Sequence, residues 1–369
     1  MFDTVKKNFG FGCMRLPMID GEVDTNEFCR MIDTFLERGF NYFDTAHGYL
    51  DGKSELALRR CLVERHPRES YVLTNKLSGG CFEKESDILP LFQTQLACCG
   101  VDYFDFYLMH AQSRNNFNKF KNCHAYEIAL SLREQGKIKH LGISFHDTAD
   151  YLDSILTEYP QIEVVQLQFN YADYDDPEVQ SKKCYDVCRK HGKPVIVMEP
   201  VKGGTLVDLP DSAKDIFDRL NTGSYASYAI RFAAGFEGIM MVLSGMGNME
   251  MMLDNCSYME NFKPLNKAEM NAVGKVRAII HNLDLIACTS CRYCTPGCPM
   301  NINIPALFSC MNGKRLWNDD KYRADYHNIH TINNGKASDC IVCGQCEKYC
   351  PQRLPIRNLL RDIANVFEN

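Results

Sequence analysis

Cysteine is the residue type whose spacing in this sequence points most directly to chemistry. The chain of 369 residues contains 19 cysteines, and eight of them lie in two short runs, 288–299 and 340–351. Each run has the spacing C-x2-C-x2-C-x3-C and is followed by proline. Thiolates in such runs bind zinc or an iron–sulfur cluster, but a zinc site with four thiolates is usually built from two C-x2-C pairs. Four cysteines in each run therefore favour two [4Fe–4S] clusters.

Over about 280–360 the chain resembles a bacterial two-cluster ferredoxin domain. This resemblance implies that the fourth cysteine of each run binds the cluster held by the other run. The first [4Fe–4S] cluster would be bound by Cys288, Cys291, Cys294 and Cys350. The second would be bound by Cys340, Cys343, Cys346 and Cys298. The intervening residues 301–338 are more than a compact ferredoxin needs and look partly helical.

The other eleven cysteines are scattered along the chain. The odd total and an amino terminus without the apolar stretch of a signal peptide argue against a disulfide framework. We expect these residues to be buried thiols in a cytoplasmic protein. Examples are Cys98, Cys99, Cys184, Cys188 and Cys310.

Composition excludes several classes of protein. The formal net charge of −6 provides no basic field for nucleic acid. No stretch approaches the roughly 18–20 consecutive apolar residues of a membrane span. With 45% hydrophobic and 24% charged residues, the chain has the composition of an ordinary globular protein.

The elements that would position a second chemical site lie in the first 265 residues. Between the β-rich segments are amphipathic ones such as 24–39, where Asp24 predicts a helix start and Gly39 its end. Eight strand–helix units over roughly 250 residues predict a (β/α)8 TIM barrel. A doubly wound sheet is less favoured, because the first strand lacks a G-x-G-x-x-G turn. The β-rich segments are 9–14, 40–44, 71–76, 103–110, 140–145, 164–169, 194–198 and 239–245.

The expected fold class is therefore α/β: a barrel over 1–264, followed by a small ferredoxin-like α+β domain over 265–369. The boundary is placed near Pro264, before a linker helix. Chemistry in such barrels sits at the carboxyl ends of the strands. Asp44, Lys76 and His110 end three successive predicted strands, and Tyr49 follows Asp44 closely.

The barrel resembles the aldo-keto reductase family over about residues 8–260. The motifs that carry the resemblance are FDTAHGYLDGKSE (43–55), LTNK (73–76), DYFDFYLMH (102–110), GKIKHLGIS (136–144), VVQLQFN (164–170), MEPVKGG (198–204) and LSGMGNMEMMLDN (243–255). The resemblance implies reduction of a small-molecule carbonyl, or oxidation of an alcohol, with NAD(P)H.

The resemblance implies that these four residues form a catalytic tetrad. Tyr49 is the expected general acid and base. Since a free tyrosine, with a pKa near 10, is a poor proton shuttle at pH 7, the Lys76 ammonium would lower that pKa. Asp44 would anchor Lys76, and His110 would orient the carbonyl. His47, in the same loop, is expected to line the pocket.

The resemblance also implies contacts to the nucleotide. Ser144 and Gln166 would hydrogen-bond the nicotinamide carboxamide, and glycines would let the backbone approach the pyrophosphate. The expected cofactor-binding residues are Ser144, Gln166, Met198, Gly203, Gly204, Ser244, Gly245, Asn248 and Asn255.

Several positions depart from the family pattern. Met198 replaces the aromatic residue that stacks on the nicotinamide, and Phe145 replaces an asparagine. Gly245 and Met251 stand where basic residues usually grip the 2′-phosphate of NADP, so selectivity for NADP would need another cation. Lys202 and Arg231 are candidates for that role. The segment around Met251 could alternatively be a helix with a methionine-rich buried face.

Two further hypotheses stay open at this stage. Nicotinamide transfers two electrons as hydride whereas each cluster passes one, so a flavin such as FMN could bind in the barrel and connect clusters to substrate. The chain could also be a non-catalytic electron-transfer or sensor protein. Either hypothesis would give the clusters a redox protein partner.

Overall fold

A computed structural model describes residues 2–317 and 319–369. These divide into two units, each with its own packing. The first comprises residues up to Pro200 together with Ala226–Asn266, and the second comprises Val201–Tyr225 together with Lys267–Asn369. No helix in the described parts of the chain is long and apolar enough to cross a membrane.

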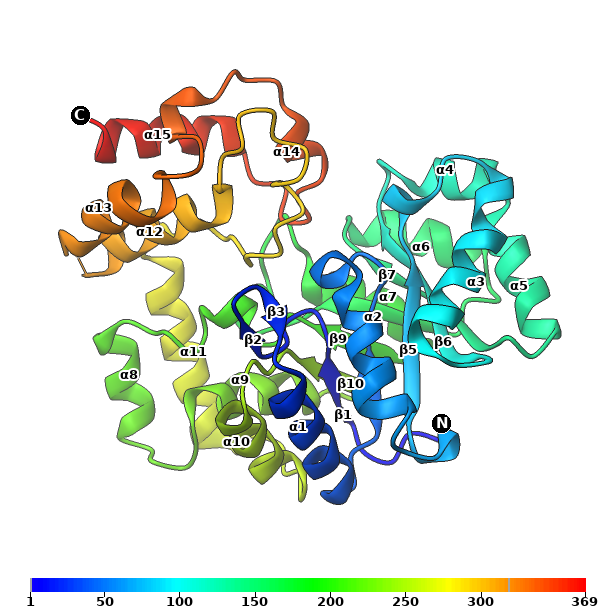
Figure 1. Cartoon of the computed structure of the whole chain (residues 1–369). Coiled ribbons are helices and arrows are strands. Elements are labelled where there is room, and N and C mark those ends of the chain that lie inside the picture. The colour runs from blue at the N-terminus through cyan, green and yellow to red at the C-terminus, as the bar shows by residue number, and fades with distance from the viewer. Residues whose placement is uncertain (1, 318) are drawn as a thin grey trace. The chain divides into compact units, whose positions relative to one another are not determined.

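The first unit is a closed barrel of eight parallel strands with helices outside (Figure 1). The strand order is β1-β10-β9-β8-β7-β6-β5-β4, and a separate two-stranded hairpin pairs β2 (Met18–Ile19) with β3 (Glu22–Val23). All eight predicted barrel strands are confirmed: β1 Phe9–Gly12, β4 Tyr42–Asp44, β5 Val72–Leu77, β6 Phe104–Gln112, β7 Ile138–Phe145, β8 Val164–Gln168, β9 Val195–Met198 and β10 Ile239–Ser244.

The helices of this unit follow the predicted alternation. The amide of Glu27 donates to the Asp24 carboxylate (3.1 Å), which starts the first helix, and Gly39 (φ 83°) follows its end. The buried side chains of that helix are Phe28, Met31, Ile32 and Phe35. The helices are α1 Thr25–Glu37, α2 Lys53–Leu58, α3 Ile88–Cys99, α4 Phe117–Asn122, α5 Ala125–Glu134, α6 Ala149–Glu158, α7 Ser181–Lys190, α9 Tyr225–Ala234 and α10 Met249–Met259.

The barrel interior is filled by side chains. Gly142 on β7 shows how tight this packing is, because a Cβ there would lie 2.5 Å from side-chain atoms of Leu108 and Val164. The cluster inside the barrel consists of Tyr42, Val72, Phe106, Leu108, Val164, Ile196, Met241 and Leu243. A packed interior leaves the ends of the strands as the place for chemistry.

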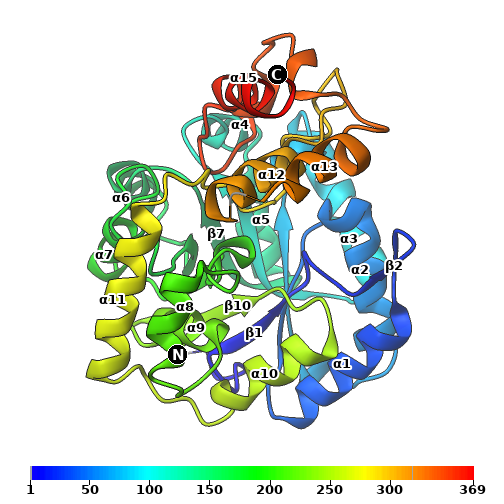
Figure 2. The ribbon, with the colours of Figure 1, turned by 90° about the vertical axis from the view of Figure 1, so that its left-hand side faces the viewer.

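The second unit is helical. Its only extended pairing in the part of the chain that the structure describes is an isolated bridge between Ile302 and Gly335, so the expected β component is small. Helices α12 and α15 pack together over Leu307, Phe308 and Leu360 (Figure 2). The helices are α8 Asp211–Asp218, α11 Lys267–His281, α12 Ile304–Trp317, α13 Lys321–Asp325, α14 Gln345–Lys348 and α15 Ile356–Phe367.

The segment Val201–Tyr225 leaves the end of β9 but folds with the second unit, whereas the expected boundary near Pro264 had placed it in the barrel. Helix α8 packs on α11, and the Thr222 hydroxyl donates to the Glu269 carboxylate (3.0 Å). Gly203 has φ 63°, and a Cβ there would lie only 2.5 Å from the carbonyl oxygen of Thr289. Thr289 lies inside the first cysteine run.

The scattered cysteines include one pair that the sequence interpretation got wrong. Cys29 on α1 and Cys61 in the π-helix Arg59–Val63 form a disulfide, with their Cα atoms 4.6 Å apart. Packing of α1 against the π-helix brings together residues that are 32 positions apart in the sequence. The expectation of a buried thiol is met at Cys99, Cys184, Cys188 and Cys310, while Cys98 is partly exposed.

Candidate active site and iron–sulfur ligands

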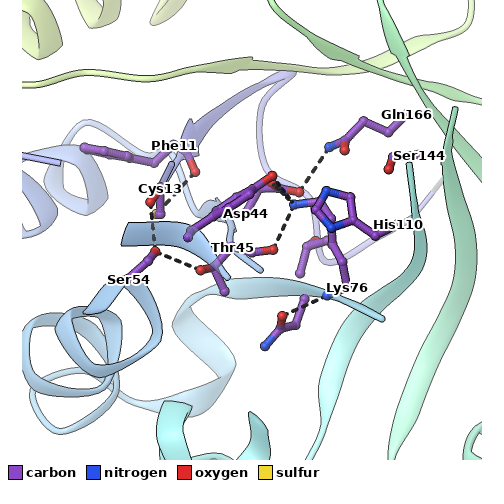
Figure 3. Close-up of polar contacts among 12 residues, drawn as sticks. Phe11, Cys13, Asp44, Thr45, Ser54, Lys76, His110, Ser144 and Gln166 are labelled. Carbon is purple, nitrogen blue, oxygen red and sulfur yellow. Dashed lines mark hydrogen bonds and ion pairs between the residues drawn. The ribbon is translucent and has the colours of Figure 1, made fainter. Parts of the chain in front are cut away.

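Asp44 and Lys76 meet at one end of the barrel (Figure 3). Tyr49 joins them through its hydroxyl group. Asp44 ends β4, and pairing of Asp44 with Thr74 sets β5 so that Lys76 reaches it. The Lys76 ammonium donates to Asp44 Oδ1 (2.5 Å), to the backbone carbonyl of Thr45 (2.8 Å) and to Tyr49 Oη (3.2 Å). The structure thus places a charged ammonium against a phenol, held there by a carboxylate.

His110 on β6 completes the group of four. Its ring centroid lies 5.9 Å from that of Tyr49, edge to face. Its Nδ1 lies 2.7 Å from the Ser78 hydroxyl. If Nδ1 accepts this hydrogen bond, Nε2 carries the proton of the neutral ring. The structure therefore brings together all four residues of the expected tetrad.

Burial separates the four residues into two pairs. Lys76 is fully buried and Asp44 nearly so, whereas Tyr49 and His110 are partly exposed. Burial raises the pKa of the Asp44 carboxyl, although the Lys76 ammonium and the Gln166 amide act in the opposite direction. Although its surface is partly exposed, the His110 ring is surrounded by protein, and this desolvation lowers its pKa well below the usual range. The positive charges of Lys76 and His146 act in the same direction. His110 is accordingly a neutral imidazole at pH 7.

A second hydrogen-bond relay supports the turn after β4. The Thr45 and Ser54 hydroxyls lie 2.8 Å apart, and Ser54 donates to the carbonyl of Cys13 (2.8 Å). The amide of Cys13 in turn donates to the backbone carbonyl of Asp44 (2.8 Å). These contacts fix the chain at the carbonyl of Asp44 and at Thr45 (Figure 3).

Two of the expected nucleotide contacts lie beside the tetrad. Ser144 and Gln166 are register partners on β7 and β8. The Gln166 amide donates to Asp44 Oδ2 (3.1 Å), and the Ser144 oxygen accepts from the amide of Ala111 (2.7 Å). Since Ser144 keeps its hydroxyl hydrogen and Gln166 its amide oxygen, this pair offers the donor and acceptor that a carboxamide needs.

The residues after β10 that are expected to contact the nucleotide are held by hydrogen bonds within their own segment. Asn255 on α10 donates to the Ser244 hydroxyl (2.8 Å), and Asn248 caps α10 by accepting from the amide of Met251 (2.9 Å). Met252 on this helix is buried while Met251 is 51% exposed. A methionine-rich buried face and the expected nucleotide contacts therefore share one element.

Arg15 is a cation close to Gly245 that the sequence interpretation missed. Arg15 follows β1, and a Cβ on Gly245 would lie 3.4 Å from Arg15 Cβ. Arg15 also forms an ion pair with Glu199 (3.6 Å). Arg231, a candidate from the sequence, donates to the carbonyls of Lys263 and Pro264 instead. A single arginine after the first strand gave no motif by which to find it.

The other expected contacts lie at and beyond the end of β9. Met198 is the last residue of that strand, and Gly203 and Gly204 belong to a short turn over Lys202–Gly204. Both glycines, together with the mostly buried Lys202, fold with the second unit.

Four cysteines of the second unit line one partly open pocket, and its empty volume of about 310 Å³ includes space open to solvent. They are Cys298, Cys340, Cys343 and Cys346. This is the set expected for the second cluster, including the exchanged Cys298. Apolar side chains such as Ile302 and Leu360 line the same pocket. Four thiols around an apolar hollow fit a [4Fe–4S] cluster.

The first set of cysteines also lies close together. Burial raises the pKa of the Cys294 thiol, and the charges of Cys291, Cys288 and Cys350 act in the same direction. Cys350 therefore lies near the first run although it belongs to the second. Among the described residues, no three Cys, His, Asp or Glu side chains are arranged to hold a single metal ion. A cluster of four irons is larger than one ion and keeps its thiolates farther apart.

Comparison with known proteins decides the family of the first unit. Residues 8–278 match the model of the aldo/keto reductase family. The chain belongs to the aldo/keto reductase family. Residues 287–354 match a 4Fe-4S dicluster domain, so the aldo/keto reductase barrel is followed by an iron–sulfur domain.

Curated relatives of this aldo/keto reductase are distant. The chain is 26% identical over 205 residues to an aldo-keto reductase of Mycolicibacterium smegmatis. It is 24% identical over 205 residues to the uncharacterized oxidoreductase YtbE of Bacillus subtilis. These matches cover 54% and 55% of this chain and 66% of each relative.

Solved structures share the barrel fold. An aldo-keto reductase from Klebsiella pneumoniae in complex with NADPH matches with a TM-score of 0.60 and 18% identity, covering 73% of this chain and 90% of its own. The holo form of an aldo-keto reductase from Bacillus halodurans matches with a TM-score of 0.59 and 22% identity, covering 73% and 92%.

Proposed function

We propose that the protein is an oxidoreductase that reduces a small-molecule carbonyl, or oxidises an alcohol, with NAD(P)H. The observation that carries this proposal is the contact between the Lys76 ammonium and Tyr49 Oη, with Asp44 behind it. The Klebsiella pneumoniae structure of the same fold holds NADPH, which supports a nicotinamide nucleotide here.

The residues of the chain would then divide the work as follows. The nicotinamide, when bound, supplies the hydride. Tyr49 gives its phenolic proton to the oxygen of the reduced carbonyl, and the Lys76 ammonium stabilises the phenolate that remains. Asp44 holds Lys76 in place. Neutral His110 donates from Nε2 to the carbonyl oxygen, and Ser144 and Gln166 hold the carboxamide.

We further propose that the iron–sulfur domain holds two [4Fe–4S] clusters with the exchanged ligands described above. The pocket lined by Cys298, Cys340, Cys343 and Cys346 supports this arrangement. Since Cys343 is exposed, the second cluster would be accessible to a redox protein partner. Eight thiolates that must remain reduced are best kept in the cytoplasm.

The direct test replaces the phenol hydroxyl. Tyr49→Phe should lower the rate of carbonyl-dependent NADPH or NADH oxidation at least about 100-fold, since general acid catalysis contributes about 10²–10⁴-fold. Tyr185→Phe is a matched control, because its hydroxyl donates to the carbonyl of Glu237 on the outside of the barrel. Equal activity of Tyr49→Phe and the parent protein would refute the proposal.

Anaerobic purification supplies a second test. Iron and sulfide analysis should give about eight of each per chain if two [4Fe–4S] clusters are present. Extraction should release no flavin. A stoichiometric flavin would instead favour the alternative in which FMN connects clusters and substrate.

A further inference from the structure

A buried carboxylate outside the tetrad has two partners, and they connect it with the loop from Thr45 to Tyr49 and with β5. Glu55 on α2 is fully buried. Its Oε2 lies 2.7 Å from Nδ1 of His47, and its Oε1 accepts from the Asn75 amide (2.7 Å). A buried carboxylate needs such donors, because an unpaired charge inside a protein is costly. The hydrogen bond between His47 and Glu55 raises the pKa of the His47 imidazole.

The same chain of contacts ends on the backbone of Lys76. The side-chain oxygen of Asn75 accepts from the backbone amide of Lys76 (2.8 Å). Gln95 on α3 donates to the backbone carbonyl of Lys76 (2.9 Å) and to the Asn75 side-chain oxygen (3.1 Å). Both backbone polar groups of Lys76 are therefore held by buried amides. The side chain of that lysine carries the ammonium that contacts Tyr49 Oη.

His47 lies two positions before Tyr49 in the sequence. The loop from Thr45 to Tyr49 is thus tied to β5 at two points. One is the Lys76 ammonium itself, and the other runs from His47 through Glu55 and Asn75. The Glu55, Asn75 and Gln95 members of this network are fully buried, whereas the His47 side chain is 28% exposed.

We propose that His47 and Glu55 form a positioning pair that sets the distance between Tyr49 Oη and the Lys76 ammonium. The pair acts through Tyr49 and Lys76 rather than on the substrate, and this role rests on the proposed function. The required feature is a hydrogen-bond donor at the place of His47 Nδ1. An asparagine side chain presents its amide nitrogen at nearly that place, whereas leucine offers no donor.

Two variants separate positioning from a direct role of the imidazole. His47→Leu should lower kcat about 10–100-fold, because a misplacement of about 1 Å at a reacting group has that effect. The KM for the nucleotide should stay within about twofold of the parent value. His47→Asn should restore kcat to within about threefold of the parent value.

A comparable pair of a histidine and a carboxylate outside the site provides a control variant. His66 Nε2 lies 2.9 Å from Asp33 Oδ1, and its side chain is 22% exposed. His66→Leu should leave kcat and KM unchanged. Equal loss in His47→Leu and His47→Asn would overturn the proposal, since it would mean that the imidazole itself is required. Unchanged kcat in His47→Leu would overturn it as well.

A readout independent of turnover keeps this test separate from that of the proposed function. The ultraviolet phenolate titration of each protein, minus that of the same protein with Tyr49→Phe, reports the Tyr49 hydroxyl alone. Its midpoint should move to higher pH in His47→Leu and return in His47→Asn, because a more distant ammonium stabilises the phenolate less. An unmoved midpoint in His47→Leu overturns the positioning role. If the parent protein lacks nicotinamide-linked activity, the proposed function fails while this titration still decides the pair.

Discussion

At the scale of single residues, burial distinguishes the residues of the site in a way that fits their proposed roles. The ammonium of Lys76 is shielded from water, so its effect on Tyr49 Oη is not weakened by solvent. Tyr49 and His110 keep partial exposure, which their proposed roles as proton donor and substrate-orienting group both need. The sequence predicted these four residues. It gave no role to Glu55, because glutamate is normally exposed to solvent.

The depressed pKa of His110 leads to a prediction about pH. The rate should show no titration of His110 between about pH 6 and 8, although a free histidine titrates near pH 6.5. His110→Gln should lower kcat/KM about 10-fold or more but leave the shape of the profile in that range unchanged. A parent profile with a limb near pH 6.5 that disappears in His110→Gln would contradict this.

The same depression affects stability in acid. The unfolded chain's imidazole binds a proton below about pH 6.5, and the folded protein's His110 does so only at lower pH. The contribution of His110 to folding is therefore present above that pH and is lost as the pH falls toward its folded pKa. Denaturant titration of the parent protein and His110→Gln at pH 7.5 and pH 5.5 would measure it.

At the scale of elements, hydrophobic periodicity together with capping and turn residues predicted most of the fold. Eight strands were predicted because each is a short β-rich run followed by an amphipathic segment, and the cap at Asp24 marked the start of α1. The Cys29–Cys61 disulfide was not predictable, because it depends on how α1 packs against a π-helix. The expectation that residues 301–338 are partly helical is confirmed by α12.

The proposed exchange of the fourth cysteine between the two cysteine runs can be tested by single substitutions. Cys350→Ala should remove the same cluster as Cys291→Ala, while Cys298→Ala should remove the same cluster as Cys340→Ala. Low-temperature electron paramagnetic resonance of the reduced proteins would show two classes of spectra, paired in this way. Spectra of Cys350→Ala that match those of Cys340→Ala would contradict the exchanged assignment.

At the scale of the whole molecule, the two units do not follow one another along the chain. The segment Val201–Tyr225 interrupts the barrel sequence between β9 and β10 and packs with residues 267–369. The boundary predicted from the sequence lies near Pro264. A linker can be recognised from its local composition, whereas a segment that packs with another unit has no local sequence pattern. The long-range contacts of Gly203 and α8 show that the segment Val201–Tyr225 packs with the second unit.

The backbone contact between Gly203 and Thr289 provides a test of this connection. Gly203→Ala should destabilise the second unit by roughly 1–3 kcal/mol, because the new methyl group meets a carbonyl oxygen at a positive φ. Hydrogen exchange should then accelerate in 201–225 and around Thr289 together. Gly274→Ala is the control, since a Cβ there meets open space on α11. Faster exchange in 201–225 alone would contradict the coupling.

The excursion of Val201–Tyr225 has a consequence for how the protein is made. During translation this segment leaves the ribosome well before the residues that it packs against, which begin at Lys267. The barrel can close once β10 has emerged, but α8 must wait with its apolar face uncovered until α11 follows. A newly made chain therefore passes through a stage in which this segment is open to proteases and to chaperones.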